Sequence, residues 1–393
     1  MSATLRIAGA RVPGRDGTCD IVVADGHIQA LEPAGRPHRN AEVLDAGGRV
    51  VVPGFVDCHT HACFAGTRYE EWAARLAGED YLAQLEGGGG IMATVRATRA
   101  ATEDELAESL LRRLDRMLRH GTTCVEVKSG YGLDTDHELK MLRAIAGAGE
   151  RFPGTIVPTA CIGHAIDPDV DRAAFIRRTI EETLPAVTEA FPGIALDAYC
   201  ERGAWSLDDA LALAEAGREA GHPVRMHADQ FNALGMIEAA VERGFLSVDH
   251  LEATGDEGLA LLAGSRTFGV MLPASGFHVD ERYADGRSFL DRGGRLALAT
   301  NYNPGSAPCP SMPFVIQLAV RRLGLRPEEA LVAATRTGAE LLGLDDRGEI
   351  APGRAADLVL LDADDPTELA FEFGANPVRR VMIGGEWIVG DHG

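Results

Sequence analysis

Residues 54–61 read GFVDCHTH, an apolar run that ends in the pair His59 and His61. Imidazoles two residues apart on a strand point to the same side of it, so both can bind one metal ion. Seven more apolar runs of strand length follow, and segments compatible with helices separate them. These runs occupy residues 124–131, 155–164, 194–201, 223–227, 246–250, 267–273 and 295–301. Eight strands that alternate with helices predict an α/β fold, a (β/α)8 barrel with its active site at one end.

Both ends of the chain lie outside the predicted barrel. Residues 1–52 and 347–393 contain short β-patterned pieces broken by Gly and Pro, a texture typical of small antiparallel sheets. We expect the two ends to build one composite β-sandwich domain. Residues 53–346 then form the metal-dependent catalytic barrel domain.

Helices and one long connection can be placed within the barrel. A capping-box pattern at Thr102 predicts a helix that stops at Gly121, and Pro327 begins another predicted helix over residues 326–343. About 60 residues separate the first two strands, far more than a normal connection. Residues 66–99 are therefore a candidate lid, with the glycine run 87–90 as its hinge or tight turn.

The composition narrows the classes of partner and the compartment. A net charge of −21 over 393 residues argues against nucleic acid or an anionic membrane as a partner. The N-terminal residues lack the apolar core of a signal peptide, which predicts a cytoplasmic protein. The seven cysteines are an odd, scattered set without CxxC spacing, and those in or next to apolar runs, Cys58, Cys124, Cys161 and Cys200, are expected to be reduced core residues.

Five of the twelve histidines fall at strand ends, which is difficult to produce by accident. They are His59, His61, His164, His227 and His250. A catalytic metal site keeps about three protein ligands and leaves a position for water. We assign His59, His61 and His227 as the ligands of a divalent or trivalent ion, zinc or iron, which would lower the pKa of its water to about 7.

The predicted centre holds one ion. A two-metal site of this kind needs a bridging anion, often a carboxylated lysine at the end of the fourth strand. The fourth strand ends in Tyr199, Cys200 and Glu201, and Lys128 lies at the end of the second strand instead. The sequence therefore predicts a mononuclear centre.

Six segments resemble those of a known group of enzymes over nearly the whole chain. They are residues 53–72, 87–106, 125–142, 226–235, 248–252 and 303–312. The motifs KSGYGL, HADQ, DHLE and NPGS within them, in this order, are similar to those of the amidohydrolase superfamily and, within it, the imidazolonepropionase family. The resemblance implies a homodimeric hydrolase that opens the cyclic amide 4-imidazolone-5-propanoate to N-formimidoyl-L-glutamate in histidine degradation.

The resemblance also implies roles for single residues. It assigns metal binding to His59, His61 and His227, and places Gln230 and His250 at the reacting centre. The remaining matches are to substrate contacts: Arg68, Tyr131, His164, Asn303, Gly305 and Ser306. A small carboxylate-bearing heterocycle suits these residues, because an arginine fork fits a carboxylate. Backbone N–H groups near Gly305 and Ser306 are expected to form an anion-binding concavity.

Asn301 departs from the family pattern. The eighth strand of the family ends in an aspartate that lies next to the metal and transfers a proton. An amide oxygen can still face a metal, but it carries no charge and accepts no proton at neutral pH. Losing a general base typically costs about 10²–10⁴ in rate. We nevertheless count Asn301 among the metal-site and catalytic candidates.

Three explanations of Asn301 are open. It is a substitution introduced to trap substrate, or a natural feature of a divergent amidohydrolase or aminohydrolase that acts on a related nitrogen heterocycle with His250 or His164 as the base. In the third explanation the chain is a catalytically impaired paralog that only binds its ligand. The retention of the other site residues favours a hydrolase over a pure binder.

Overall fold

The computed structural model describes residues 4–35, 41–77 and 90–390. Its central sheet has eight parallel strands that neighbour each other in chain order. The strands are β6 (Phe55–Asp57), β7 (Thr122–Lys128), β8 (Thr155–Gly163), β9 (Ala195–Cys200), β10 (Val224–Ala228), β11 (Ser247–His250), β12 (Phe268–Met271) and β13 (Leu296–Leu298). The two ends of the sheet approach each other just beyond β6 and β13, where the Asn301 N–H donates to the His59 carbonyl at 3.0 Å. The prediction of an eight-stranded barrel is confirmed.

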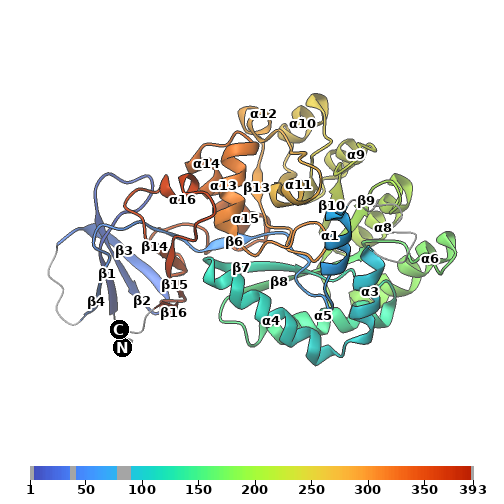
Figure 1. The fold of residues 1–393 in the computed structure, drawn as a ribbon, viewed down its shortest axis with the longest axis horizontal. Coiled ribbons are helices and arrows are strands. Elements are labelled where there is room, and N and C mark those ends of the chain that lie inside the picture. Colours follow the sequence, from blue (N-terminus) through green and yellow to red (C-terminus); the bar gives the residue numbers. More distant parts are fainter. Residues whose placement is uncertain (1–3, 36–40, 78–89, 391–393) are drawn as a thin grey trace.

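Helices surround the barrel strands (Figure 1). In chain order they are α1 (Tyr69–Leu76), α3 (Ile91–Ala100), α4 (Glu103–Arg119), α5 (Thr135–Gly149), α6 (Arg172–Arg178), the π-helical turn η1 (Thr179–Thr183), α7 (Leu184–Ala190), α8 (Leu207–Glu219), α9 (Met236–Arg243), α10 (Asp256–Ala263), α11 (Pro273–Val279), α12 (Gly286–Asp291), α13 (Met312–Arg322), α14 (Pro327–Ala333), α15 (Arg336–Leu341) and α16 (Glu368–Phe371). Of the predicted lid, α1 and α3 are formed. Residues 78–89, which include most of the glycine run 87–90, lie outside the described residues.

The helix predicted from the capping box is α4. Thr102 Oγ1 accepts the Glu105 N–H at 3.2 Å, and Glu105 Oε2 accepts the Thr102 N–H at 2.8 Å. Both orphan donors at the start of the helix are thereby satisfied. Leu106, Leu110 and Leu114 recur on the buried face.

The helix predicted over residues 326–343 is two helices in the structure. α14 begins at Pro327 as expected, but the chain leaves the helical conformation at Thr335, where φ is −133° and ψ is −89°. The Ala334 carbonyl accepts the Val56 N–H of β6 at 2.9 Å. Packing on the first barrel strand therefore breaks a pattern that looked continuous in sequence.

Two four-stranded sheets form a sandwich on one side of the barrel (Figure 1). One sheet contains β1 (Thr4–Ala10), β2 (Cys19–Ala24), β3 (His27–Pro33) and β4 (Ala41–Asp45), and the other contains β5 (Val51–Pro53), β14 (Leu358–Leu361), β15 (Val378–Ile383) and β16 (Glu386–Val389). A shared core joins Ile7 and Val23 to Leu358 and Met382. The two ends of the chain thus build one β-sandwich, as predicted.

One expectation about the sandwich was wrong. The N-terminal sheet is not purely antiparallel, because β1 pairs with β4 in the parallel direction, with Leu5 opposite Glu42. The β2–β3 hairpin lies against the other edge of β1, so β4 occupies the edge that remains.

The junction between sandwich and barrel is short. β5 ends at Pro53 and β6 begins at Phe55, so only Gly54 separates them. A Cβ atom on Gly54 would lie 2.2 Å from Thr123 Oγ1, closer than any side chain can approach. The exact domain boundaries at residues 52–53 and 346–347 remain a prediction.

The seven cysteines are all free thiols, and six of them are buried. The core assignment of Cys58, Cys124, Cys161 and Cys200 is therefore confirmed. Within the described part of the chain, no helix combines the length and the apolar character that crossing a bilayer requires.

Candidate active site

The five histidines predicted at strand ends meet at the carboxyl end of the barrel. His59 and His61 follow β6, His164 follows β8, His227 lies in β10 and His250 ends β11. Ring centroids are 4.4 Å apart for His59 and His227, 4.5 Å for His61 and His164, and 5.6 Å for His227 and His250. Segments up to 191 positions apart in sequence thus supply one cluster of imidazoles.

Three of these imidazoles have the geometry of a metal site. One ring nitrogen from each of His59, His61 and His227 lies within 4.8 Å of the others, and the Nε2 atoms of His61 and His227 are 2.9 Å apart. Burial, the largest cause, lowers the pKa of all three below the usual histidine value, so each ring is neutral and keeps a lone pair.

Buried atoms without partners provide a test of whether a metal fits. His59 Nε2 and Asn301 Oδ1 are buried and form no hydrogen bond with any described residue. Leaving such an atom unsatisfied typically costs about 1–3 kcal/mol. A cation would use both lone pairs, and neutral imidazoles are preferred ligands of zinc and iron. The residues present fit a metal ion.

Two carboxylates hold the histidines from behind. His59 Nδ1 donates to Asp249 Oδ2 at 2.6 Å, and His227 Nδ1 donates to Asp197 Oδ1 at 3.0 Å. With the proton on Nδ1, the Nε2 lone pair of each ring points away from its carboxylate. Such partners fix the tautomer and raise the basicity of metal-binding histidines.

The two carboxylates are the ends of a buried chain of five charged side chains, here named the ionic chain. It runs in the order Asp197, Lys128, Glu126, Arg225, Asp249. Lys128 Nζ is 2.7 Å from both Asp197 Oδ2 and Glu126 Oε1. Arg225 lies 3.4 Å from Glu126 and 2.7 Å from Asp249. Acidic and basic groups alternate, so every buried charge has an opposite neighbour.

The ionic chain was not predicted from the sequence. Its signal was present, because Glu126, Asp197, Arg225 and Asp249 interrupt apolar strand runs at positions that cannot reach solvent. A charge inside such a run needs a buried partner. Strand order in the closed barrel was required to identify which residues are the partners.

Asn301 lies directly beside the histidine cluster. Its Nδ2 donates to Ser275 Oγ at 2.8 Å, which leaves Oδ1 as the free acceptor. Its φ of 53° is in the left-handed region, which asparagine adopts more readily than most residues.

Gln230 and His250 are held by neighbours that the sequence did not reveal. Tyr199 donates its hydroxyl to Gln230 Oε1 at 2.7 Å, so the amide Nε2 of Gln230 is the end available as a donor. His250 Nδ1 lies 3.2 Å from Glu252 Oε1, and its φ of 99° is unusual for a residue with a Cβ. Strained backbone of this kind concentrates at functional sites. Tyr199 stands at a strand end, which was the one available signal for it.

Tyr131 and His164 stand together beside the cluster. The His164 Nδ1–H donates to the Gly130 carbonyl at 2.9 Å, and burial lowers the pKa of His164 to about 3. His164 is therefore neutral and presents Nε2 as an acceptor. Glu138 holds the loop of Tyr131 by accepting the N–H groups of Gly130, Gly132 and Leu133 at 2.7–2.9 Å.

The loop of Asn303 differs from the expectation that its backbone would bind an anion. The N–H groups of Gly305 and Ser306 both donate to Asn303 Oδ1 at 2.8 Å, so they are already satisfied. Gly305 instead makes room for an arginine, because a Cβ there would lie 2.8 Å from Arg68 Nη1. Arg68 in turn donates through Nε to Glu71 at 2.6 Å. An anion at this position has side chains to bind, rather than backbone.

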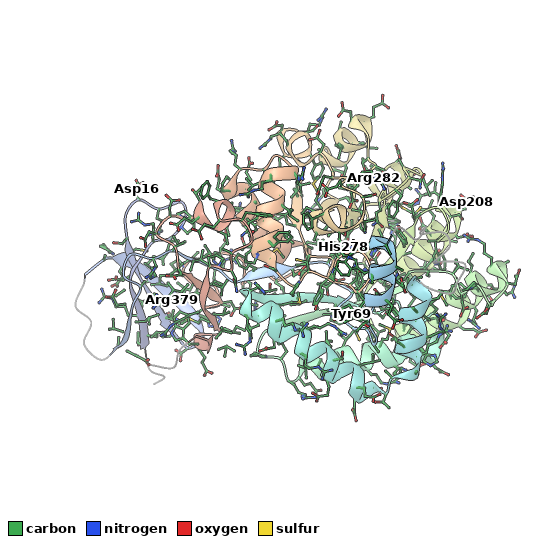
Figure 2. The ribbon with its side chains drawn as sticks, viewed as in Figure 1. Asp16, Tyr69, Asp208, His278, Arg282 and Arg379 are labelled. Atoms are coloured by element: carbon green, nitrogen blue, oxygen red, sulfur yellow. The ribbon has the colours of Figure 1, made fainter. Side chains whose placement is uncertain are left out.

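All the site residues predicted from the sequence, except His59, line one cavity of about 390 Å³, a size suited to a small molecule. The sequence did not identify five of its lining residues, which are Ile91, Tyr199, Phe231, Val279 and Asp280. Arg282, labelled in Figure 2, stacks on Phe231 with its guanidinium carbon 4.9 Å from the ring centroid. The loop after α11 therefore braces the loop after β10 at the rim.

Comparison with known proteins agrees with this barrel and its histidine cluster. Residues 50–388 match the model of the amidohydrolase family, and the chain belongs to that family. Its curated relatives include the imidazolonepropionase of Rubrobacter xylanophilus, 43% identical over 93% of this chain and 89% of that protein. The imidazolonepropionase of Herpetosiphon aurantiacus is 44% identical over 87% of this chain and 82% of its own length.

Solved structures support the fold at much lower identity. A 5-methylcytosine deaminase from Klebsiella pneumoniae, liganded with 5-fluorocytosine, superposes with a TM-score of 0.79 at 17% identity, covering 98% of each chain. The N-isopropylammelide isopropylaminohydrolase of Burkholderia multivorans gives 0.74 at 20% identity, over 99% of this chain and 98% of that one.

Proposed function

We propose that this chain is a metal-dependent hydrolase that opens the ring of 4-imidazolone-5-propanoate and yields N-formimidoyl-L-glutamate in histidine degradation. The observation that carries the proposal is the meeting of His59 with His61 and His227, because the latter two line a pocket that Arg68 also lines. Curated relatives at 39–44% identity that carry the name imidazolonepropionase support the same reaction.

The metal ligands proposed are His59, His61 and His227, with Asn301 Oδ1 as a neutral oxygen donor. We propose one ion per chain, zinc or iron. When bound, the ion supplies Lewis acidity that polarises the attacked carbonyl and acidifies water. The ionic chain keeps His59 and His227 in the tautomer that this role needs.

His250 is proposed as the proton acceptor. Water attacks the ring carbonyl carbon, its proton passes to His250 Nε2, and the same proton then goes to the ring nitrogen as the C–N bond breaks. The contact between Nδ1 and Glu252 keeps Nε2 directed to this task. Asn301 cannot accept the proton in this chain, because its amide has no basic atom at neutral pH. Gln230, oriented by Tyr199, donates its amide N–H to the substrate.

The carboxylate end of the substrate is assigned to side chains. Arg68 offers a planar fork, and the hydroxyls of Ser306 and Tyr131 are the neutral donors beside it. Asn303 shapes the loop by accepting its backbone N–H groups. The neutral His164 Nε2 is left to accept a ring N–H.

A ligand-binding paralog is the second candidate, and Asn301 favours it. The amide removes the negative charge that the family places beside the metal. Hydrolysis of a ring related to imidazolone by the same histidine cluster is the other alternative, and the same test addresses it.

The test is incubation of the purified protein with 4-imidazolone-5-propanoate and added zinc or iron. Loss of the ring's ultraviolet absorbance, with N-formimidoyl-glutamate as product, is expected. We expect Asn301→Asp to raise the rate by about 10²–10⁴. Absence of turnover by both forms would disprove this substrate and lead to cyclic amides, hydantoins and aminated heterocycles. Tight binding by calorimetry without product would identify a binder.

We further propose a homodimer that works in the cytoplasm without nucleic acid or membrane partners. The family resemblance and the net charge of −21 support these assignments. Sedimentation at several concentrations measures the oligomeric state.

A further inference from the structure

Two carboxylates inside the barrel bind the Lys128 ammonium, as they could bind a metal cation. Its Nζ lies 2.7 Å from Glu126 Oε1 and 2.7 Å from Asp197 Oδ2, and all three side chains are fully buried. Arg225 shares Glu126 Oε1 at 3.4 Å, so over the ionic chain as a whole three carboxylates face two cations and the charge is negative.

A second cluster of potential ligand atoms meets at the same carboxylate. Cys161, Asp197 and His227 each offer a ligand atom within 4.8 Å of the others. Asp197 Oδ2 is buried, with Lys128 Nζ as its ionic partner at 2.7 Å and no further bond to the described residues, so removing the ammonium would leave this oxygen unpaired. His227 belongs to both groups, but its Nδ1–H already donates to Asp197 and its Nε2 lies in the metal centre, so Asp197 and Cys161 are the members of this cluster left for a second ion.

We propose that the Lys128 ammonium takes the place of a second metal ion and limits the chain to one. Without it, Asp197, Glu126 and Asp249 keep Arg225 alone as a counter-charge in the ionic chain, and a divalent cation bound by Glu126, Asp197 and Cys161 would neutralise the two negative charges left over. Cys161 would release its proton to solvent on binding. The proposal rests on the metal centre proposed above, and it places the determinant of metal number at β7 rather than at the fourth strand of the barrel.

The experiment counts cobalt in the full-length protein after chelation, reloading and desalting. The wild type is expected to retain one Co²⁺ per chain. Lys128→Ala should retain two and gain a thiolate-to-cobalt charge-transfer absorption. Lys128→Arg, which keeps the charge, is the matched control and should retain one. The double variant Lys128→Ala/Cys161→Ser should lose the charge-transfer absorption.

Each outcome decides. One ion in a folded Lys128→Ala, two ions in the wild type, or two ions without the thiolate absorption would overturn the proposal. No metal in the wild type would instead overturn the metal centre itself. If Lys128→Ala folds only when Co²⁺ is supplied, the ion replaces the ammonium and the proposal stands. If it stays unfolded with Co²⁺, as followed by circular dichroism, the replacement fails.

Discussion

The histidine cluster and the ionic chain beneath it are both buried, but they differ in how fully their polar atoms are paired. His59 Nε2 and Asn301 Oδ1 in the upper layer form no hydrogen bond with any described residue. Below them each charged side chain faces an opposite charge within 3.4 Å. The free lone pairs beside the histidine cluster are available to a ligand. The paired charges of the ionic chain keep the histidine rings in place. Reactivity and orientation are thus assigned to separate layers.

Removing an imidazole from the histidine cluster should have the largest effect on metal content and activity. We expect His227→Ala to lose the metal and to lower activity about 10³-fold or more, since Lewis-acid stabilisation is worth several kcal/mol. Elemental analysis and the ring-opening assay measure the two effects. His137→Ala, on α5 and outside the cavity, is the matched control. Full metal content in His227→Ala would remove this residue from the ligand set.

Disrupting the ionic chain should weaken the binding of the same metal ion without removing a ligand. Asp249→Asn leaves Arg225 with one carboxylate partner and no longer fixes the tautomer of His59. We expect metal affinity to fall by about 10–100-fold and the free energy of unfolding to fall by about 3 kcal/mol. Competition with a chelator and denaturant titration measure these changes.

Ser247→Ala provides the control for that variant. It removes the hydroxyl that donates to Asp249 Oδ1 at 2.6 Å and accepts from Arg225 Nε at 3.0 Å, while both charges remain, so stability should fall by about 1–3 kcal/mol, with metal affinity unchanged. Equal metal loss in both variants would mean that the lower layer acts through packing rather than through charge.

The loop of Tyr131 should respond in substrate binding alone. Glu138→Gln turns an amide N–H towards the Gly130 N–H, and two donors facing each other cost about 1–3 kcal/mol. We expect KM to rise about tenfold with metal content unchanged, as measured by steady-state kinetics. Glu150→Gln, exposed at the end of the same helix, should behave as the wild type. A loss of metal in Glu138→Gln would contradict the separation of the loop from the centre.

Glu71 should give the smallest effect. It holds Arg68 through an ion pair whose side chains are 15% and 18% exposed, and so competes with the substrate carboxylate. Ion pairs that keep contact with solvent are worth about 0.2–1 kcal/mol, so Glu71→Gln should lower KM by up to about fivefold. Glu70→Gln on the same helix is the control. A higher KM would indicate that Glu71 orients Arg68 instead.

The fold was largely predictable because each barrel strand is a short apolar run with a helical segment after it. Local patterning misled only where distant segments decide the outcome. The carbonyl of Ala334 bonds to Val56, nearly 280 positions away, and this divides a helix that looked continuous. The parallel pairing of β1 with β4 likewise depends on which edge the β2–β3 hairpin leaves free.

Within the site, the histidines could be predicted from the sequence, because the strand ends of a barrel converge by the symmetry of the fold. Their supports were not, because Asp197 and Lys128 become neighbours only when β7, β8 and β9 are laid side by side. Asn303 shows a different limit. Its side chain accepts the N–H groups of Gly305 and Ser306, which the sequence predicted to bind an anion. Only the three-dimensional structure shows that these donors are already used.

Gly54 has a consequence for how the chain comes apart on heating. It is the sole link between the last N-terminal strand of the sandwich and the strand that leads to His59, and it is too crowded to accept even a methyl group. Such a short connection cannot absorb a displacement, so unfolding of the terminal sheets would directly displace His59, the first imidazole of the cluster. Sandwich and barrel should therefore denature as one cooperative unit, and a bound ion should raise the melting temperature of both.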